Sequence, residues 1–163
     1  MIVCMKDRYG VPSNMFGVVP DDFYAIVGRV IMLATQVEYR VLALLWALDR
    51  QQPQDVHAGK PARELLKECR SRLHGHDQAI RDAGRGLLTR VQAALDERHA
   101  VAHSLWPSPG LDRAYGWRPI IEKRRTQGSW IASTETSEIE LVTLIGTLVR
   151  LVEELKDFTD RLS

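Results

Sequence analysis

The spacing of the apolar residues after Pro20 constrains the fold more than any other feature of this sequence. They recur at steps of three and four, the period of one face of an α-helix. Pro20 and Asp21 are typical of a helix start, and the pattern ends near Gln52 and Pro53. Gly28, inside the stripe, indicates a close contact with another helix. The stripe itself consists of Phe23, Ile26, Val27, Val30, Ala34, Val37, Val41, Leu44, Leu45 and Leu48.

Three further segments have helical signals. They run from about Pro61 to Leu73, from about Asp77 to Ala102, and from Ser137 to the end of the chain. Ser137 with Glu140 three residues later is a capping-box pattern. The last segment has an apolar stripe of Ile139, Val142, Ile145, Val149, Val152, Leu155 and Phe158. Four such helices predict an all-α fold, an up-and-down four-helix bundle.

Two segments stand outside this helical pattern. Residues 1–20 contain scattered glycine and proline and are predicted to form an irregular N-terminal arm. Residues 104–136 are too long for a structureless loop, and their strand-like stretches, Tyr115–Glu122 and Ser129–Ser133, predict a small β-hairpin inserted before the last helix. Pro119 fits only an edge strand. Because 163 residues suit one core, we expect a single domain over residues 1–163.

Composition limits the classes of partner. Lys and Arg total 22 against 21 Asp and Glu, so the net charge of +1 gives no global attraction for nucleic acid or membrane. Only two cysteines are present, and Lys6, Asp7 and Arg8 interrupt any signal-like start. The longest apolar run, Val41–Leu48, is far shorter than the ~20 residues of a membrane span. We therefore expect a cytoplasmic protein without a membrane anchor.

Arg98 is the residue that departs most from the core pattern. It lies three residues after Leu95, four after Ala94 and seven after Val91, so it continues the stripe of the third helix toward the core. A buried guanidinium without a partner is strongly unfavourable. Arg98 must therefore be paired, for example with Glu38 of the first helix, or open onto a cleft or a subunit interface.

Two histidines lie beside Arg98 on the same helix. Asp96, His99 and His103 are three and four residues apart, so they share a neighbouring face. Arg98 and His103 are roughly 140° apart around the axis and ~7.5 Å apart along it, so one helix does not easily aim both at one atom. Two copies related by a twofold axis could contribute one group each to a joint site. His99 and His103 could also bind zinc, but no further ligands complete a set.

The stretch Glu97-Arg98-His99-Ala100-Val101-Ala102-His103-Ser104-Leu105-Trp106 resembles the R-x4-6-H motif of HEPN domains. In that family the residue after the arginine is usually Asn, Asp or His, and His99 stands there. The layout is also similar, with an acidic residue, Glu38, in a long first helix and the motif near the end of the third. The resemblance spans roughly Asp21 to Leu162. HEPN toxins silenced by nucleotide transfer have a tyrosine where this chain has Leu105, so we do not expect that control.

The resemblance implies a metal-independent endoribonuclease, active as a homodimer, that leaves a 2′,3′-cyclic phosphate and a 5′-hydroxyl. It implies catalytic roles for Arg98 and His103, supported by His99, Asp96 and Glu38. An imidazole, with a reference pKa near ~6.5, can exchange a proton with a ribose or leaving oxygen. A guanidinium can hold a phosphate by two charge-assisted hydrogen bonds. No cofactor or metal is expected, and an antitoxin protein is a conceivable partner in a toxin–antitoxin or phage-defence system.

Alternatives remain open at this point. Some HEPN domains are non-catalytic, so the chain could instead be a helical module that dimerises or binds a nucleotide or protein partner. A basic cluster in the inserted segment could grip single-stranded RNA, or could equally be a solvated turn. Its members are Arg118, Lys123, Arg124 and Arg125, with Trp117 for stacking and Arg113 beside them. His57, His74 and His76 are predicted to be solvated, and Cys69 to be inert core.

Overall fold

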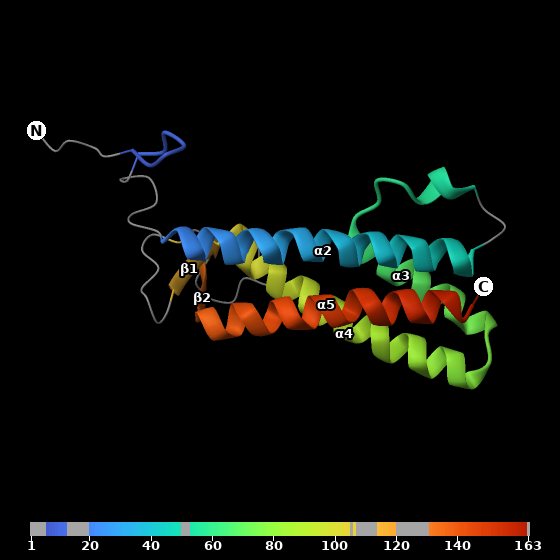
Figure 1. Ribbon diagram of the computed structural model, residues 1–163. Coiled ribbons are helices and arrows are strands. Elements are labelled where there is room, and N and C mark those ends of the chain that lie inside the picture. The colour runs from blue at the N-terminus through green and yellow to red at the C-terminus, as the bar shows by residue number, and fades with distance from the viewer. Residues whose placement is uncertain are drawn as a thin grey trace, which may run out of the picture. The chain divides into compact units, whose positions relative to one another are not determined.

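The computed structural model describes residues 6–12, 20–49, 53–104, 106, 114–119 and 131–162, with only the backbone at 54, 114–119 and 131–134. Figure 1 shows that long helices dominate this part of the chain, so the predicted all-α class is confirmed. Of the predicted N-terminal arm, residues 6–12 form a turn closed by one bridge between Lys6 and Pro12. The elements in order are α2 (Asp21–Leu48), η1 (Gln54–His57), α3 (Ala62–Arg72), η2 (Leu73–Gly75), α4 (Gln78–His103), β1 (Ala114–Pro119), β2 (Ile131–Thr136) and α5 (Glu138–Asp160).

The chain divides into two compact units. The first comprises Met1–Arg29 and His99–Thr143, and the second comprises Val30–Arg98 and Leu144–Ser163. The boundaries fall within α2, α4 and α5, so each of these helices contributes residues to both units.

The second unit has a core made by four helical segments. Each helix contributes the residues of one stripe, because only one face of an amphipathic helix can be removed from water. The buried side chains are Val30, Ala34, Val37, Val41, Leu44, Leu45, Leu65, Leu66, Cys69, Leu73, Leu87, Leu88, Val91, Ala94, Leu95, Leu144, Leu148, Leu151, Leu155 and Phe158. The stripe predicted for α2 is therefore correct in this unit from Val30 to Leu45, whereas Leu48 is only partly buried.

Helices α2 and α3 run in the same direction in this unit. The Cys69 Sγ atom lies 3.7 Å from the Val41 carbonyl oxygen, and Arg72 at the end of α3 binds Asp49 just after α2. The described part of the connection, residues 53–61, therefore leads back along α2 to the start of α3. The predicted up-and-down order does not hold for this pair, because the spacing of apolar residues gives no helix direction and this connection is long enough to return.

Gly84 lies where α4 packs closely against Leu73 and Phe158 in the second unit. A Cβ atom there would lie 2.8 Å from Leu73 Cδ1 and 3.0 Å from Phe158 Cζ. Gly28, where the sequence predicts a close contact, has no described atom within 4 Å of a Cβ position. The prediction was therefore attached to the wrong glycine, because sequence alone does not say which face of a glycine-bearing helix meets a neighbour.

The last helix buries a stripe that agrees with the predicted one only at Leu155 and Phe158. Within α5 the buried residues are Leu141, Leu144, Leu148, Leu151, Leu155 and Phe158. Ile139, Val142 and Val149 of the predicted stripe are 78%, 51% and 40% exposed. Two apolar stripes run along α5, and the helical period does not distinguish them.

The first unit contains the start of α5 and the two strands. Ser137 and Glu140 form the predicted capping box: the Ser137 amide donates to Glu140 Oε2 at 2.7 Å, and the Glu140 amide donates to Ser137 Oγ at 3.2 Å. Strands β1 and β2 pair antiparallel, with Ala114 opposite Thr136 and Pro119 opposite Ile131. The rings of Phe23 and Trp106 meet edge to face, with centroids 5.5 Å apart.

Helix α2 is long and apolar enough to cross a membrane by length and composition, as the single such helix in the described part of the chain. A core helix passes the same test, so this is weak evidence of location. Only 33% of its most apolar window is buried within the chain. The high hydropathy of α2 therefore also comes from apolar residues outside its buried stripe.

Candidate functional site

Arg98 pairs with Glu38 across the second unit. Arg98 continues the buried stripe of α4, and its Nη2 atom donates to Glu38 Oε1 of α2. The side chains stay 23% and 33% exposed. The ion pair that the position of Arg98 predicted is confirmed, and the pair opens to solvent.

The Arg98 guanidinium keeps unused donors. It carries five N–H bonds, and among the described residues only Glu38 accepts from it. Its Nε atom is buried and has no hydrogen-bond partner in the described part of the chain. A single carboxylate therefore holds the group in place without saturating it, and an anionic oxygen reaching its exposed side would find donors.

His99 and His103 lie together in the last turns of α4, in the first unit. Both are exposed, and their ring centroids are 4.4 Å apart with the planes tilted by 46°. This agrees with the shared face that their spacing predicted. Asp96, in the second unit, is exposed and accepts a hydrogen bond from Gln92 Nε2 at 3.0 Å. The structure thus pairs Arg98 of α4 with Glu38 of α2 in the second unit, and places His99 beside His103 of α4 in the first unit.

Most of the residues predicted to bind RNA lie outside the part of the chain that the structure describes. Arg118 and Trp117 lie in β1, opposite Ala132 and Ser133, where the backbone alone is described. Lys123, Arg124, Arg125 and Arg113 lie outside the described residues, so the basic cluster stays a prediction. Trp106 has a structural contact, because its Nε1 donates to the Val101 carbonyl oxygen at 3.1 Å.

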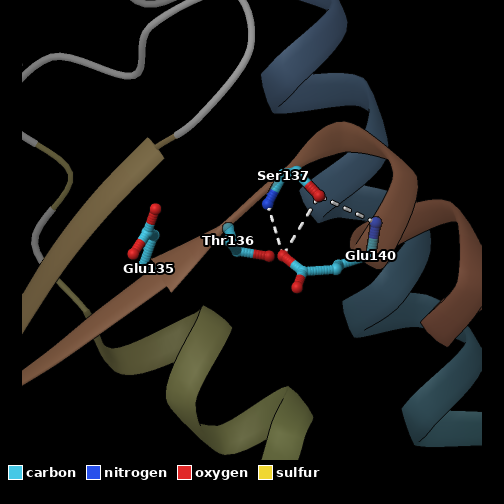
Figure 2. Close-up of a pocket in the computed structure, with 4 residues that line it drawn as sticks. All are labelled: Glu135, Thr136, Ser137 and Glu140. Atoms are coloured by element: carbon cyan, nitrogen blue, oxygen red, sulfur yellow. Dashed lines mark hydrogen bonds between the residues drawn. The ribbon is translucent and has the colours of Figure 1, made fainter.

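A small open pocket of about 160 Å³ lies where β2 meets α5, and Figure 2 shows its four lining residues. They are Glu135, Thr136, Ser137 and Glu140. The Glu140 carboxylate also accepts from Ser137 Oγ at 3.1 Å, so the helix cap occupies part of the lining. In the described residues no group of three or more His, Cys, Asp or Glu could hold a metal ion. We assign the pocket no ligand.

Sequence reasoning missed a cluster of charged residues around the buried ring of His57. His57 is 2% exposed, contrary to the predicted solvation. Its Nε2 lies 3.3 Å from Asp49 Oδ2 and its Nδ1 lies 3.3 Å from Glu68 Oε2. Lys60 Nζ donates to Glu68 Oε1 at 2.6 Å, and Arg72 Nε donates to Asp49 Oδ2 at 2.6 Å. The signal available in the sequence was the Glu68–Arg72 spacing of four on α3.

Two pKa values in this region are displaced. The pKa of Glu68 is lowered, first by its hydrogen bond from Lys60 and then by the positive charges of Lys60 and Arg72, although partial burial opposes this. Burial raises the pKa of the Cys69 thiol to about 12. Cys69 is therefore a neutral core residue, as predicted, and a poor nucleophile.

Neither family models, nor curated proteins, nor solved structures match this chain. The resemblance to HEPN domains therefore rests on the motif of residues 97–106 and on the layout of the helices around it.

Proposed function

We propose that this protein is a metal-independent endoribonuclease of the HEPN type that cleaves single-stranded RNA. The observation that carries the proposal is the partly exposed Arg98–Glu38 pair. It joins the motif arginine to the acidic residue that the resemblance names, from a helix 60 residues away in sequence. A guanidinium held by one carboxylate, with donors left over, suits the binding of a phosphodiester.

The proposed reaction uses the ribose as its own nucleophile. His103 takes the proton from the 2′-hydroxyl, the 2′-oxygen attacks phosphorus, and the bond to the 5′-oxygen breaks. The leaving 5′-oxygen takes a proton from an imidazolium or water, which leaves a 2′,3′-cyclic phosphate and a 5′-hydroxyl. Arg98 stabilises the extra negative charge on the phosphoryl oxygens. His99, stacked beside His103, and Asp96 support the catalytic pair.

The proposed site is shared by two copies of the chain. Arg98 and His103 project from α4 roughly 140° apart, so an arginine from one subunit and a histidine from the other meet more easily than two groups from one helix. A twofold homodimer forms two such sites, each with Arg98 of one subunit and His103 of the other. The active form in this proposal is therefore the homodimer.

The finer architecture belongs to the same proposal. The four helices would form a bundle with one crossover connection, residues 49–61, and β1 and β2 would form a hairpin inserted in residues 104–136. Arg118, Lys123, Arg124 and Arg125, with Trp117, would grip RNA beside the site. A cytoplasmic toxin or defence nuclease, restrained by an antitoxin protein, fits these features.

The proposal is tested by RNA cleavage in excess chelator, with end-group analysis of the products. Arg98→Ala and His103→Ala should each lower the cleavage rate by about 10²-fold or more. Matched controls are Arg150→Ala and His74→Ala, which remove an exposed arginine and an exposed histidine elsewhere. If the Arg98 and His103 variants cleave like the wild type, the activity belongs to a contaminant and the proposal is wrong.

One observation favours a second candidate, a non-catalytic helical module that binds a nucleotide or protein partner. Arg98 already has an intrachain carboxylate, as a purely structural arginine would. In that case RNA stays intact with wild-type protein. The two candidates separate on product formation: cyclic phosphate ends that depend on Arg98 support the nuclease, whereas Arg98-dependent binding without cleavage supports the module.

A further inference from the structure

A second apolar stripe runs along the outside of α2 in the second unit. At about 100° per residue, its residues fall within an arc of about 80°, centred about 130° from the buried stripe. Ile31 is 42% exposed and Tyr39 is 53% exposed. The members of this outer α2 face are Ile31, Thr35, Tyr39, Leu42 and Trp46.

The outer α2 face contains no charged residue, and its polar groups that need a partner to be buried are the Tyr39 hydroxyl and the Trp46 indole N–H. The Thr35 hydroxyl donates to the Ile31 carbonyl oxygen of its own helix at 3.1 Å. The rings of Tyr39 and Trp46 pack edge to face, with centroids 6.5 Å apart. A helix that is apolar on two sides usually buries both of them, and the core accounts for only one.

The candidate site borders this face. Glu38 falls on the helix between the buried stripe and Ile31, so the Arg98–Glu38 pair lies along one edge of the outer α2 face. A molecule that covers the face therefore comes to lie beside Arg98.

We propose that a second copy of this chain covers the outer α2 face in a twofold homodimer. A twofold axis sets a patch against its own copy, so a patch of one charge would repel itself, whereas an uncharged one does not. This inference rests on the proposed function, because the joint site needs a second subunit beside Arg98. It adds the surface through which that subunit binds.

The charges of α2 favour a protein partner over a lipid surface. Helices that lie in a membrane interface usually carry several Lys or Arg along the polar side. Between Ile31 and Trp46 the only basic residue is Arg40. The opposite stripe of the same segment is already buried in the core.

The test is the mass of the full chain in solution, by sedimentation equilibrium, for the wild type, Thr35→Arg and Tyr39→Arg. Both positions are exposed and helical, so arginine there should leave the fold intact, which circular dichroism and thermal unfolding check. We expect a wild-type dimer, with dissociation constants at least about 30-fold higher in both variants. Ile139→Arg, on an exposed aliphatic residue of α5, is the matched control and should dimerise normally.

Each outcome decides the inference. A wild-type monomer at high micromolar concentration, or folded Thr35→Arg and Tyr39→Arg variants that dimerise like Ile139→Arg, overturns it. If the wild type is monomeric and floats with anionic phospholipid vesicles, the outer α2 face binds a lipid bilayer and not a second copy of the chain. If the variants are monomeric but still cleave RNA, the outer α2 face is the dimer interface, but the active site does not need residues from two subunits. If the wild type dimerises through this face without cleaving RNA, the inferred interface holds and only the proposed nuclease activity is wrong.

Discussion

Two groups of charges in the second unit are arranged in opposite ways. Around His57, two carboxylates and two cations surround a ring that is 2% exposed, and Asp49 itself is only 13% exposed. At Arg98 a single carboxylate meets a single guanidinium, and both remain partly exposed. The first group is closed, since Asp49 contacts both His57 and Arg72, and Glu68 contacts His57, Lys60 and Arg72. The second is open, since its guanidinium has donors to spare.

The difference separates a structural role from a functional one. Charges that each compensate several partners hold elements together, here the end of α2, the 53–61 connection and α3. A charge that is fixed on one side and exposed on the other can still bind a ligand, at the expense of some stability. On this comparison Arg98 is the better candidate for function, although the His57 cluster contains more titratable groups.

The largest expected effect is the loss of a partner from the closed group. Asp49→Ala leaves Arg72 without its hydrogen-bond acceptor and His57 without one of its two carboxylate neighbours. We expect the free energy of unfolding to fall by about 3 kcal/mol, because Arg72 loses the acceptor of its hydrogen bond and the 2% exposed His57 ring loses a carboxylate contact. Urea unfolding measures this.

Asp55→Ala is the matched control, since Asp55 is an exposed aspartate in the same connection. It should change stability by no more than about 0.5 kcal/mol. A loss below about 1 kcal/mol for Asp49→Ala would mean that water enters the His57 cluster, and the contrast with Arg98 would disappear.

The packing beside the closed group gives the second effect. Gly84→Ala places a Cβ atom 2.8 Å and 2.9 Å from the two Leu73 methyl carbons, which must shift within a packed core. Gly146→Ala on α5 meets no described atom within 4 Å and should gain up to about 1 kcal/mol from helix propensity. Because both changes share that gain, the Gly84 variant should be less stable than the Gly146 variant by about 2 kcal/mol. Equal melting temperatures would contradict the close approach.

The third effect is a pH dependence from Glu68. Its pKa is lowered in the folded chain, so the unfolded chain binds the proton more readily in acid. The stabilisation is complete above the ordinary glutamate pKa and is lost as the pH falls through the folded-state value. Urea unfolding from about pH 7 to about pH 3 should therefore show a steeper acid loss for wild type than for Glu68→Gln. Parallel curves would mean that Lys60 does not hold this carboxylate.

Some of this architecture could be predicted from the sequence, because local periodicity determines it. The bounds of α3 and α4, the core stripe of α2 and the Ser137–Glu140 cap follow from side-chain spacing alone. Arg98 was recognisable because it interrupts an apolar stripe, and the requirement for a partner led to Glu38.

The rest depends on tertiary packing that spacing does not encode. His57 sits in a polar connection, and it is buried through its contacts with Asp49 and Glu68, which lie on other elements. The buried face of α5 could not be chosen, because Ile139, Val142 and Val149 follow the helical period as well as the buried leucines do. The catalytic roles of Arg98 and His103 depend on a second subunit, which a single chain does not contain.

The smallest expected change in stability is also the one that tests the open group. Glu38→Gln keeps the shape of the side chain and removes its charge, so Arg98 loses an ion pair while its exposed side stays hydrated. For such a partly exposed pair we expect a loss below about 1 kcal/mol in urea unfolding. If Arg98 binds phosphate, the same variant should bind single-stranded RNA with an altered affinity, measured by fluorescence anisotropy, whereas Asp55→Ala should not. A stability loss as large as that of Asp49→Ala, with unchanged RNA binding, would make the Arg98–Glu38 pair a second structural cluster and remove the difference between the two groups.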